Sequence, residues 1–295
     1  MRRFGSLVGR LGVVVVLTAL LAGALPAAAA LPMTPDGVAP AALSPQDART
    51  DKERLWSNGC FTPVERVTLR DCVFGDRGSG FTLALVGDSH LSHLFAGFER
   101  LANKRGWRLV VYVKASCPFL DIAIRNVLLD REYTECATWN KRVLKKLKQI
   151  RPDLTVTLAF RGIRPMKAFF DTPTREGQAI GRMLGKVPGR RVVLVDPPYS
   201  SRSIPDCLVA AGGSAESCRI PSWDVLTAGV RTRERAAAAV ANATYVDLTD
   251  RICGGFPCKV VTNGIVMFRD NHHLTNTYAA TLRDALGKAM DRALD

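Results

Sequence analysis

The sequence predicts an α/β fold, a three-layer α/β/α sandwich around a parallel, flavodoxin-like sheet. Short apolar, β-branched runs alternate with amphipathic helical patterns from residue 81 onward. Helical connections of this length suit parallel strands, which need crossover connections and are covered on both faces. The 295 residues are 47% apolar and 23% charged, which is typical of one sizeable globular domain with a buried core.

The predicted elements follow in chain order. We expect strands at residues 81–86, 108–113, 154–160, 191–195 and 244–248. We expect helices at residues 91–104, 137–150, 174–186, 222–241 and 275–294. The helix at 137–150 carries lysines on one face and apolar residues on the other, so its charge is interpreted as a solvated surface.

The beginning of the chain has the pattern of an export signal. Three arginines in the first ten residues precede an apolar run at 11–25, and an alanine tract ends at Ala30. We therefore expect residues 1–30 to be a signal peptide or a signal anchor, since about 20 apolar residues can span a bilayer. Residues 31–58 show no sustained period and are interpreted as a linker, with the folded domain at 59–295.

Eight cysteines agree with an oxidising compartment outside the cytoplasm. None belongs to a Cys-x-x-Cys pair of the zinc or thioredoxin kind, and neither the thiols nor the histidines have metal-ligand spacing. We expect no metal, and instead four disulfides between cysteines that are close in sequence. The predicted pairs are Cys60–Cys72, Cys117–Cys136, Cys207–Cys218 and Cys253–Cys258.

The net charge of +14 points to an anionic partner. For an exported chain, that partner is expected to be an anionic envelope polymer and not a nucleic acid. The sequence contains no Gly-rich phosphate loop and no dinucleotide fingerprint, so we expect no cofactor.

A candidate nucleophile follows the first predicted strand. The apolar run at 83–86 stops at a Gly-Asp-Ser-His turn that carries Ser89. A serine needs a base within hydrogen-bond reach, usually a histidine that a carboxylate orients. If the later Asp-Asn-His-His segment forms a helical turn, Asp270 and His273 point the same way, so His273 is the better base and His272 points elsewhere.

Each of these residues also has a simpler interpretation. An Asp-Ser pair commonly caps a helix at a strand-to-helix turn. His90 and His93 could serve packing or capping beside that turn, although His93 is a rival for contact with the serine. His272 could be a surface or hydrogen-bonded loop histidine.

Two segments, residues 86–90 (Val-Gly-Asp-Ser-His) and 270–274 (Asp-Asn-His-His-Leu), resemble the SGNH (GDSL-type) hydrolase superfamily. More narrowly, they resemble the extracytoplasmic SGNH domain of acyltransferase-three-type membrane O-acyltransferases, which O-acetylate envelope polysaccharides. The resemblance also covers residues 42–45, 71–76, 106–109, 114–118 and 269–278. It implies the SGNH-hydrolase fold, with Ser89 as nucleophile, His273 as general base and Asp270 as its orienting acid.

The oxyanion hole departs from the superfamily pattern, which usually has a glycine after the second strand and an asparagine after the third. Here these places read Lys-Ala-Ser-Cys at 114–117 and Ala-Phe-Arg-Gly at 159–162. We predict the backbone N–H of Ser89 and a backbone donor near Ser116 as the hole. Arg161 is a further candidate, with a strand-end salt bridge as its alternative.

These observations predict extracytoplasmic acyl-ester chemistry, either O-acyl transfer to an envelope polysaccharide or hydrolysis from it. The expected substrates are an acylated polysaccharide or a small ester, and a separate membrane acyltransferase is the expected acyl donor for the transfer reaction. The alternative is a non-catalytic SGNH-fold module that binds anionic envelope polymer. Because only a neutral imidazole acts as a base, activity is expected to rise with pH through about 6 to 7.

Overall fold

The computed structural model describes residues 42–222 and 229–295. Its central sheet consists of β1 (Phe61–Thr62), β2 (Cys72–Gly75), β3 (Thr82–Gly87), β4 (Arg108–Lys114), β7 (Leu154–Leu158), β8 (Arg190–Leu194) and β9 (Thr244–Val246). The spatial order is β1-β4-β3-β7-β8-β9, and β2 also pairs with β4. All of these pairings are parallel except that of β2, which is antiparallel to β4. The predicted parallel α/β sheet is therefore confirmed, with one antiparallel strand that the sequence analysis does not foresee.

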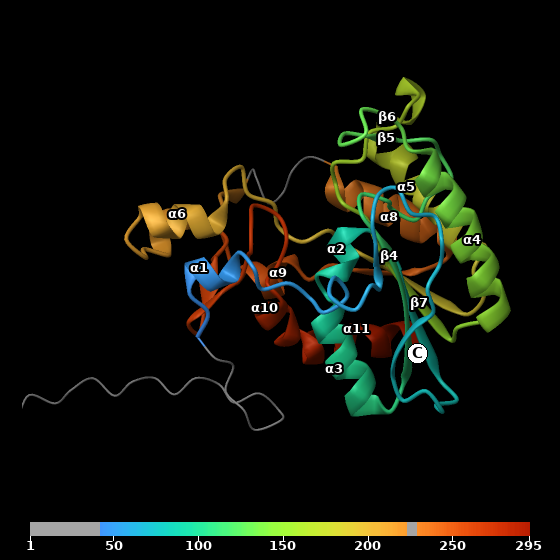
Figure 1. Cartoon of the computed structure of the whole chain (residues 1–295), viewed down its shortest axis with the longest axis horizontal. Coiled ribbons are helices and arrows are strands. Elements are labelled where there is room, and N and C mark those ends of the chain that lie inside the picture. Colours follow the sequence, from blue (N-terminus) through green and yellow to red (C-terminus); the bar gives the residue numbers. More distant parts are fainter. Residues whose placement is uncertain (1–41, 223–228) are drawn as a thin grey trace, which may run out of the picture. The chain divides into compact units, whose positions relative to one another are not determined.

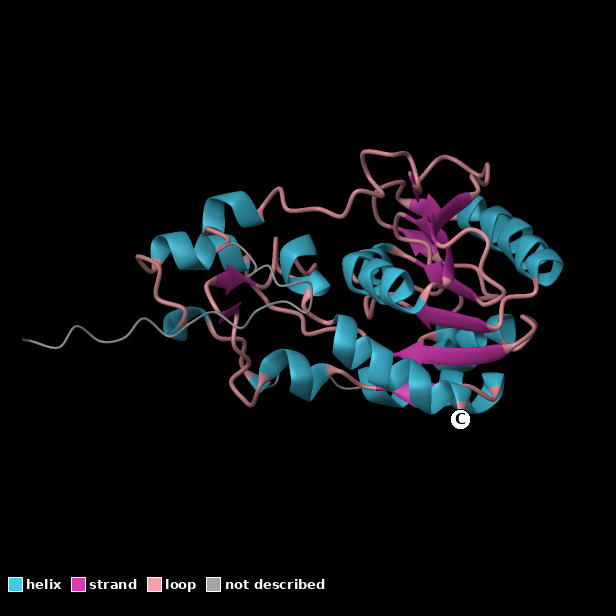
Figure 2. Cartoon of the chain, turned by 90° about the horizontal axis from the view of Figure 1, so that it is seen from below, coloured by secondary structure: helices cyan, strands magenta, loops and turns pink. Residues whose placement is uncertain are grey.

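Helices cover both faces of this sheet (Figure 1, Figure 2). The main ones are α3 (Phe95–Arg105), α4 (Thr134–Ile150), α5 (Pro173–Leu184), α8 (Val230–Ala241) and α11 (Arg283–Leu294). Shorter helices are α1 (Pro45–Ala48), α2 (Ser89–Ser92), α6 (Ile204–Ala210), α9 (Thr249–Cys253) and α10 (Asn276–Ala280), with 3-10 turns η1 (Ala168–Phe170) and η2 (Glu216–Cys218). Two small ladders pair β5 (Arg125–Asn126) with β6 (Arg131–Glu132) and β10 (Val261–Thr262) with β11 (Ile265–Val266).

The sheet separates two apolar cores, and β3 contributes to both because successive side chains point to opposite faces. Leu83 and Leu85 belong to the core that includes residues of α3 and α11. Ala84 and Val86 belong to the core that includes residues of α4, α5 and α8. All six residues of β3 are buried, which is typical of a central strand in a sheet covered on both sides.

The predicted helices at 91–104 and 275–294 are each interrupted. In the first, α2 ends at Ser92 and α3 begins at Phe95; in the second, α10 ends at Ala280 and α11 begins at Arg283. Of the predicted helix at 222–241, the structure describes α8 from residue 230, and residues 223–228 lie outside the described part of the chain.

Residues 42–58 are not the linker that the sequence predicts. Ala48 and Leu55 are buried in the core with Cys60 and Phe61, and Leu43 pairs with Ile265 of β11. Small apolar residues spaced through a polar segment carry little periodic signal, which is why the sequence analysis misses this packing. The domain therefore extends upstream of residue 59.

All four predicted disulfides are present, and the eight cysteines are all paired. The predicted export signal at 1–30 lies outside the described residues. Within residues 42–222 and 229–295, none of the helices has both the length and the apolar character needed to cross a membrane.

Candidate active site

The carboxyl end of β3 delivers Ser89 to the first position of α2. Asp88 holds this turn, because its carboxylate accepts the N–H of His90 at 2.9 Å and the N–H of Phe160, just beyond β7, at 2.8 Å. Gly87 permits the close approach of the two strands, since a Cβ there would lie 2.5 Å from the carbonyl oxygen of Leu158. The capping interpretation therefore describes Asp88 correctly, and Ser89 is partly exposed at the start of α2.

The second half of the site is a turn between β11 and α10. Phe268 and Leu274 form an antiparallel bridge that closes it. Inside the turn, one oxygen of Asp270 accepts the N–H groups of His272 at 2.8 Å and His273 at 2.7 Å. The sequence analysis makes this convergence conditional on a helical turn, and that condition is not met, since α10 begins only at Asn276. An Asp side chain that bonds the backbone two and three residues on produces the same convergence.

Ser89, His273 and Asp270 form a continuous hydrogen-bonded chain. Nε2 of His273 lies 3.0 Å from Oγ of Ser89, and its Nδ1 lies 2.8 Å from the second oxygen of Asp270. With a proton on Nδ1 donated to the carboxylate, Nε2 is free to accept the serine hydroxyl. This is the relative arrangement of a nucleophile, a base and an orienting acid.

The pKa shifts of Asp270 and His273 suit this arrangement. Burial by itself would raise the pKa of Asp270, but its hydrogen bonds to His273 and to the turn backbone outweigh burial and hold the pKa below its usual value. Burial lowers the pKa of His273, helped by the nearby His90 and Arg269 and opposed by Asp270. His273 is therefore a neutral imidazole at neutral pH, as a base must be.

A second chain of hydrogen bonds runs beside the first and joins Asp196, His90 and His272. Nδ1 of His90 lies 2.5 Å from Asp196 Oδ1, and Nε2 of His90 lies 2.8 Å from Nδ1 of His272. Asp196 and His90 are fully buried. The sequence analysis gives His90 a packing or capping role and Asp196 none; the position of Asp196 directly after a predicted strand is the only sequence signal for it.

His93 is used structurally. It is fully buried, and its Nδ1 accepts the N–H of Leu274 at 3.4 Å. Burial, together with the neighbouring His90 and His273, lowers its pKa well below the usual value, so its ring stays neutral. These contacts fit the packing interpretation of His93.

The predicted oxyanion donors lie in two different environments. Ser89 opens α2, and a helix leaves its first N–H groups without internal partners, although α2 spans only four residues. Ser116 follows β4 in a turn closed by the N–H of Cys117 on the carbonyl of Lys114, and its φ of 51° is in the left-handed region. Ser116 thus has the backbone conformation that favours glycine, at the place where the superfamily usually has one.

Arg161 has the contacts of a strand-end ion pair. Its Nε lies 3.1 Å from Asp196, its own N–H also donates to Asp196, and its guanidinium donates to the carbonyl of Pro197 at 2.6 Å. These contacts match the salt-bridge alternative for Arg161. They also explain Asp196, because burial would raise the pKa of this carboxyl, whereas His90, Arg161 and Arg233 hold it below its usual value.

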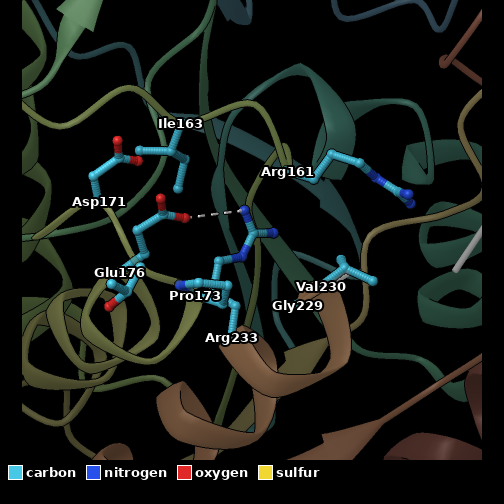
Figure 3. Close-up of a pocket in the computed structure, with 9 residues that line it drawn as sticks. Arg161, Ile163, Asp171, Pro173, Glu176, Gly229, Val230 and Arg233 are labelled. Atoms are coloured by element: carbon cyan, nitrogen blue, oxygen red, sulfur yellow. Dashed lines mark ion pairs between the residues drawn. The ribbon is translucent and has the colours of Figure 1, made fainter. Parts of the chain in front are cut away.

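Arg161 also lines a charged cavity of about 250 Å³, together with Glu176 and Arg233. Glu176 and Arg233 face each other across it at 4.0 Å (Figure 3). Burial raises the pKa of Glu176 to about 7. Two cations that line this cavity, Arg161 and Arg233, also lower the pKa of Asp196 and so help to keep it ionised.

Three histidines come within metal-ligating distance of one another, contrary to what their sequence spacing predicts. One ring nitrogen from each of His90, His272 and His273 can be chosen so that the three atoms lie within 4.8 Å of one another. Among the described residues, this is the one cluster whose side chains are close enough to hold a metal ion together. Both nitrogens of His90 and of His273 already bond Asp196, His272, Asp270 or Ser89. The cluster is therefore organised as a hydrogen-bonded network.

A buried carboxylate from the N-terminal segment connects both halves of the site. Glu53 accepts hydrogen bonds from the hydroxyl of Ser92 in α2 and from the indole of Trp56. Its other oxygen lies 2.8 Å from Nη1 of Arg269, the residue before Asp270. The sequence analysis misses Glu53, because a single glutamate in an irregular segment carries no motif.

Known proteins share this architecture. The family model described as "SGNH domain (fused to AT3 domains)" matches residues 59–288. The periplasmic domain of a lipopolysaccharide acetyltransferase from Salmonella ser. Paratyphi A superposes with a TM-score of 0.59 and 15% identity, covering 73% of this chain and 85% of that chain.

Two esterases are structurally more distant. A carbohydrate acetylesterase from Sinorhizobium meliloti gives a TM-score of 0.44 at 15% identity, over 72% of this chain and 99% of that chain. An acetylxylan esterase from Geobacillus stearothermophilus gives 0.40 at 11% identity, over 73% and 96%. No curated protein sequence matches the chain. On the family match over residues 59–288 and on its fold, the chain belongs to the family of SGNH domains that occur fused to AT3 domains.

Proposed function

We propose that this protein is an acyl-ester enzyme in which Ser89 is the nucleophile, His273 the general base and Asp270 the residue that orients it. The observation that carries the proposal is the unbroken chain from Ser89 Oγ through both nitrogens of His273 to Asp270, with contacts of 3.0 and 2.8 Å. Membership of the SGNH family and the shared fold support acyl-ester chemistry in general.

Each proposed step balances with the residues of the site. His273 takes the Ser89 proton as Oγ bonds to the acyl carbon, and returns it to the leaving oxygen of the donor as that ester bond breaks. An acceptor hydroxyl or water then gives its proton to His273 and attacks the acyl carbon. The bond between the acyl carbon and Oγ breaks, and Oγ takes the proton back. The N–H groups of Ser89 and of the Ser116 turn are the proposed donors to the oxyanion.

The proposed substrates are envelope polysaccharides, which accept the acyl group in transfer or, when already acylated, lose it in hydrolysis. The Salmonella domain is described as part of a lipopolysaccharide acetyltransferase, and similarity of fold makes this the leading substrate class to test here. Four disulfides fit an exported protein, because such bonds persist in oxidising compartments. We further propose that a separate membrane acyltransferase supplies the acyl group when the reaction is transfer, and that the leader directs export.

The experiment uses p-nitrophenyl acetate with the wild type, Ser89→Ala and His273→Ala. Loss of either residue should lower turnover by about 10⁴-fold or more, since triad members act as a unit. Mass spectrometry of the wild type should find acetyl on Ser89. The matched control is Lys145→Gln on the solvent-exposed face of α4, which should turn over normally.

Equal turnover in all four proteins would disprove the triad. A protein without turnover that binds anionic polysaccharide would instead be the non-catalytic module.

A further inference from the structure

The Asp196–His90–His272 chain holds the ring of His272 in one orientation. Because Asp196 is ionised, it accepts the proton on Nδ1 of His90 across 2.5 Å. Nε2 of His90 in turn lies 2.8 Å from Nδ1 of His272. Nδ1 of His272 is therefore engaged by His90, and Nε2 is the second nitrogen of this ring.

The buried end of the chain is held from two sides, because Asp196 and His90 are fully buried and Asp196 also contacts the guanidinium of Arg161 at 3.1 Å. Burial, together with His90 and His273, lowers the pKa of His272 to about 3, so His272 is neutral at neutral pH. A neutral imidazole has one nitrogen with a proton and one with a lone pair, so Nε2 of His272 can form a hydrogen bond with a hydroxyl in either tautomer.

His272 differs from His90 in being only partly buried, and it lies next to the base. Its ring centroid is 4.1 Å from that of His273, whose Nε2 contacts Ser89. Its ring also stacks with those of Phe160 and Tyr199, at centroid distances of 5.2 and 6.0 Å. A partly exposed imidazole nitrogen beside two aromatic rings is a surface that suits a polyol, with its hydroxyl groups and apolar C–H faces.

We propose that His272 Nε2 is a binding site for the hydroxyl-bearing acceptor of the acyl group, a sugar hydroxyl, and that His90 and Asp196 are positioning residues that hold the His272 ring in place. This inference rests on the proposed function, since it concerns the step after acyl-Ser89 has formed. His273 still removes the acceptor proton. His272 holds a hydroxyl of the acceptor so that a sugar, and not only water, competes for the acyl group.

The test measures how acyl-Ser89 partitions. The full chain is supplied with p-nitrophenyl acetate and methyl α-D-glucopyranoside, and the ratio of acetylated glucoside to free acetate is determined by mass spectrometry. This ratio is set after acylation, so a variant that only perturbs folding or acylation does not change it. Release of p-nitrophenol in the first turnover reports acylation separately.

The variants separate binding from packing. His272→Phe keeps a ring without a nitrogen, and the ratio should fall about threefold to tenfold, the value of one hydrogen bond. His272→Gln places a carbonyl oxygen near the position of Nε2 and should restore part of the ratio. His90→Asn keeps a donor toward Asp196 but cannot reach His272, so the ratio should fall by a smaller factor. Lys145→Gln on α4 is the control.

The outcomes distinguish the two proposals. Absence of acetyl-Ser89 in the wild type would overturn the proposed function itself. If acetyl-Ser89 forms but the wild type transfers nothing to the glucoside, or if His272→Phe and His90→Asn have the wild-type ratio, the acceptor site is overturned. A lower ratio in both, with partial rescue by His272→Gln, supports it.

Discussion

Replacing Glu53 by glutamine tests whether the N-terminal segment is an integral part of the domain. The carboxylate of Glu53 is buried, and it lies 2.8 Å from Nη1 of Arg269, whose side chain is only 3% exposed. Glutamine preserves size and can still accept the hydrogen bonds of Ser92 and Trp56, but it leaves the charge of Arg269 buried without its counterion. Breaking a buried pair from one side typically costs about 3 to 5 kcal/mol. That is a large share of the roughly 5 to 15 kcal/mol that holds a domain folded.

The neighbouring residue provides a matched control. Arg54 pairs with Glu99, but its side chain is 57% exposed, and exposed pairs contribute only about 0 to 1 kcal/mol. Arg54→Gln should therefore lower the free energy of unfolding by less than about 1 kcal/mol. The measurement is urea unfolding followed by tryptophan fluorescence, with the disulfides intact.

A double-mutant cycle with Arg269→Gln completes the experiment. Removing both charges should cost less than the sum of the two single changes, because neither is then left alone. The buried pair does not join the N-terminal segment to the site if Glu53→Gln lowers the free energy of unfolding no more than Arg54→Gln does. The same conclusion follows if the effects of Glu53→Gln and Arg269→Gln are additive. The family model begins at residue 59, so a large effect at Glu53 would also place the functional boundary upstream of it.

Two further predictions follow from the structure. Burial lowers the pKa of His273, and protonation of its imidazole removes the base. Esterase activity should therefore fall with decreasing pH, with a midpoint below about 6.5, the usual pKa of histidine. A midpoint at or above 7 in the acylation rate contradicts the buried environment of this imidazole. Gly177→Ala should lower stability by about 1 to 3 kcal/mol, because its Cβ would lie 2.0 Å from the carbonyl oxygen of Arg233 where α5 packs on α8. Gly80→Ala is the control, because a Cβ at residue 80 would have no atom within 4 Å. Equal unfolding midpoints for the two variants would contradict the close packing at Gly177.

The acidic midpoint refines the range predicted from sequence. An unperturbed histidine titrates at about 6.5, which is the basis for expecting activity to rise between about 6 and 7. The sequence contains no information on burial of His273, and burial is the first cause of the lowered pKa.

Sequence patterns alone predicted the class of the fold and selected the proposed catalytic residues. The alternation of β-branched runs with amphipathic helices predicts the parallel sheet, because period and length depend only on local spacing. Spacing also predicts the four disulfides, which join cysteines close in sequence. Ser89, Asp270 and His273 can be selected because they belong to short motifs that a strand end or a turn keeps together.

Tertiary structure alone decided which distant groups meet. Asp196 contacts His90 across 106 residues, and Glu53 contacts Arg269 across 216, and neither residue belongs to a motif. Asp270 and His273 converge without a helical turn, because side-chain hydrogen bonds to the backbone replace helical ones. Local spacing is visible in a sequence, whereas the pairing of buried charges depends on which strand ends and loops the fold brings to the same place.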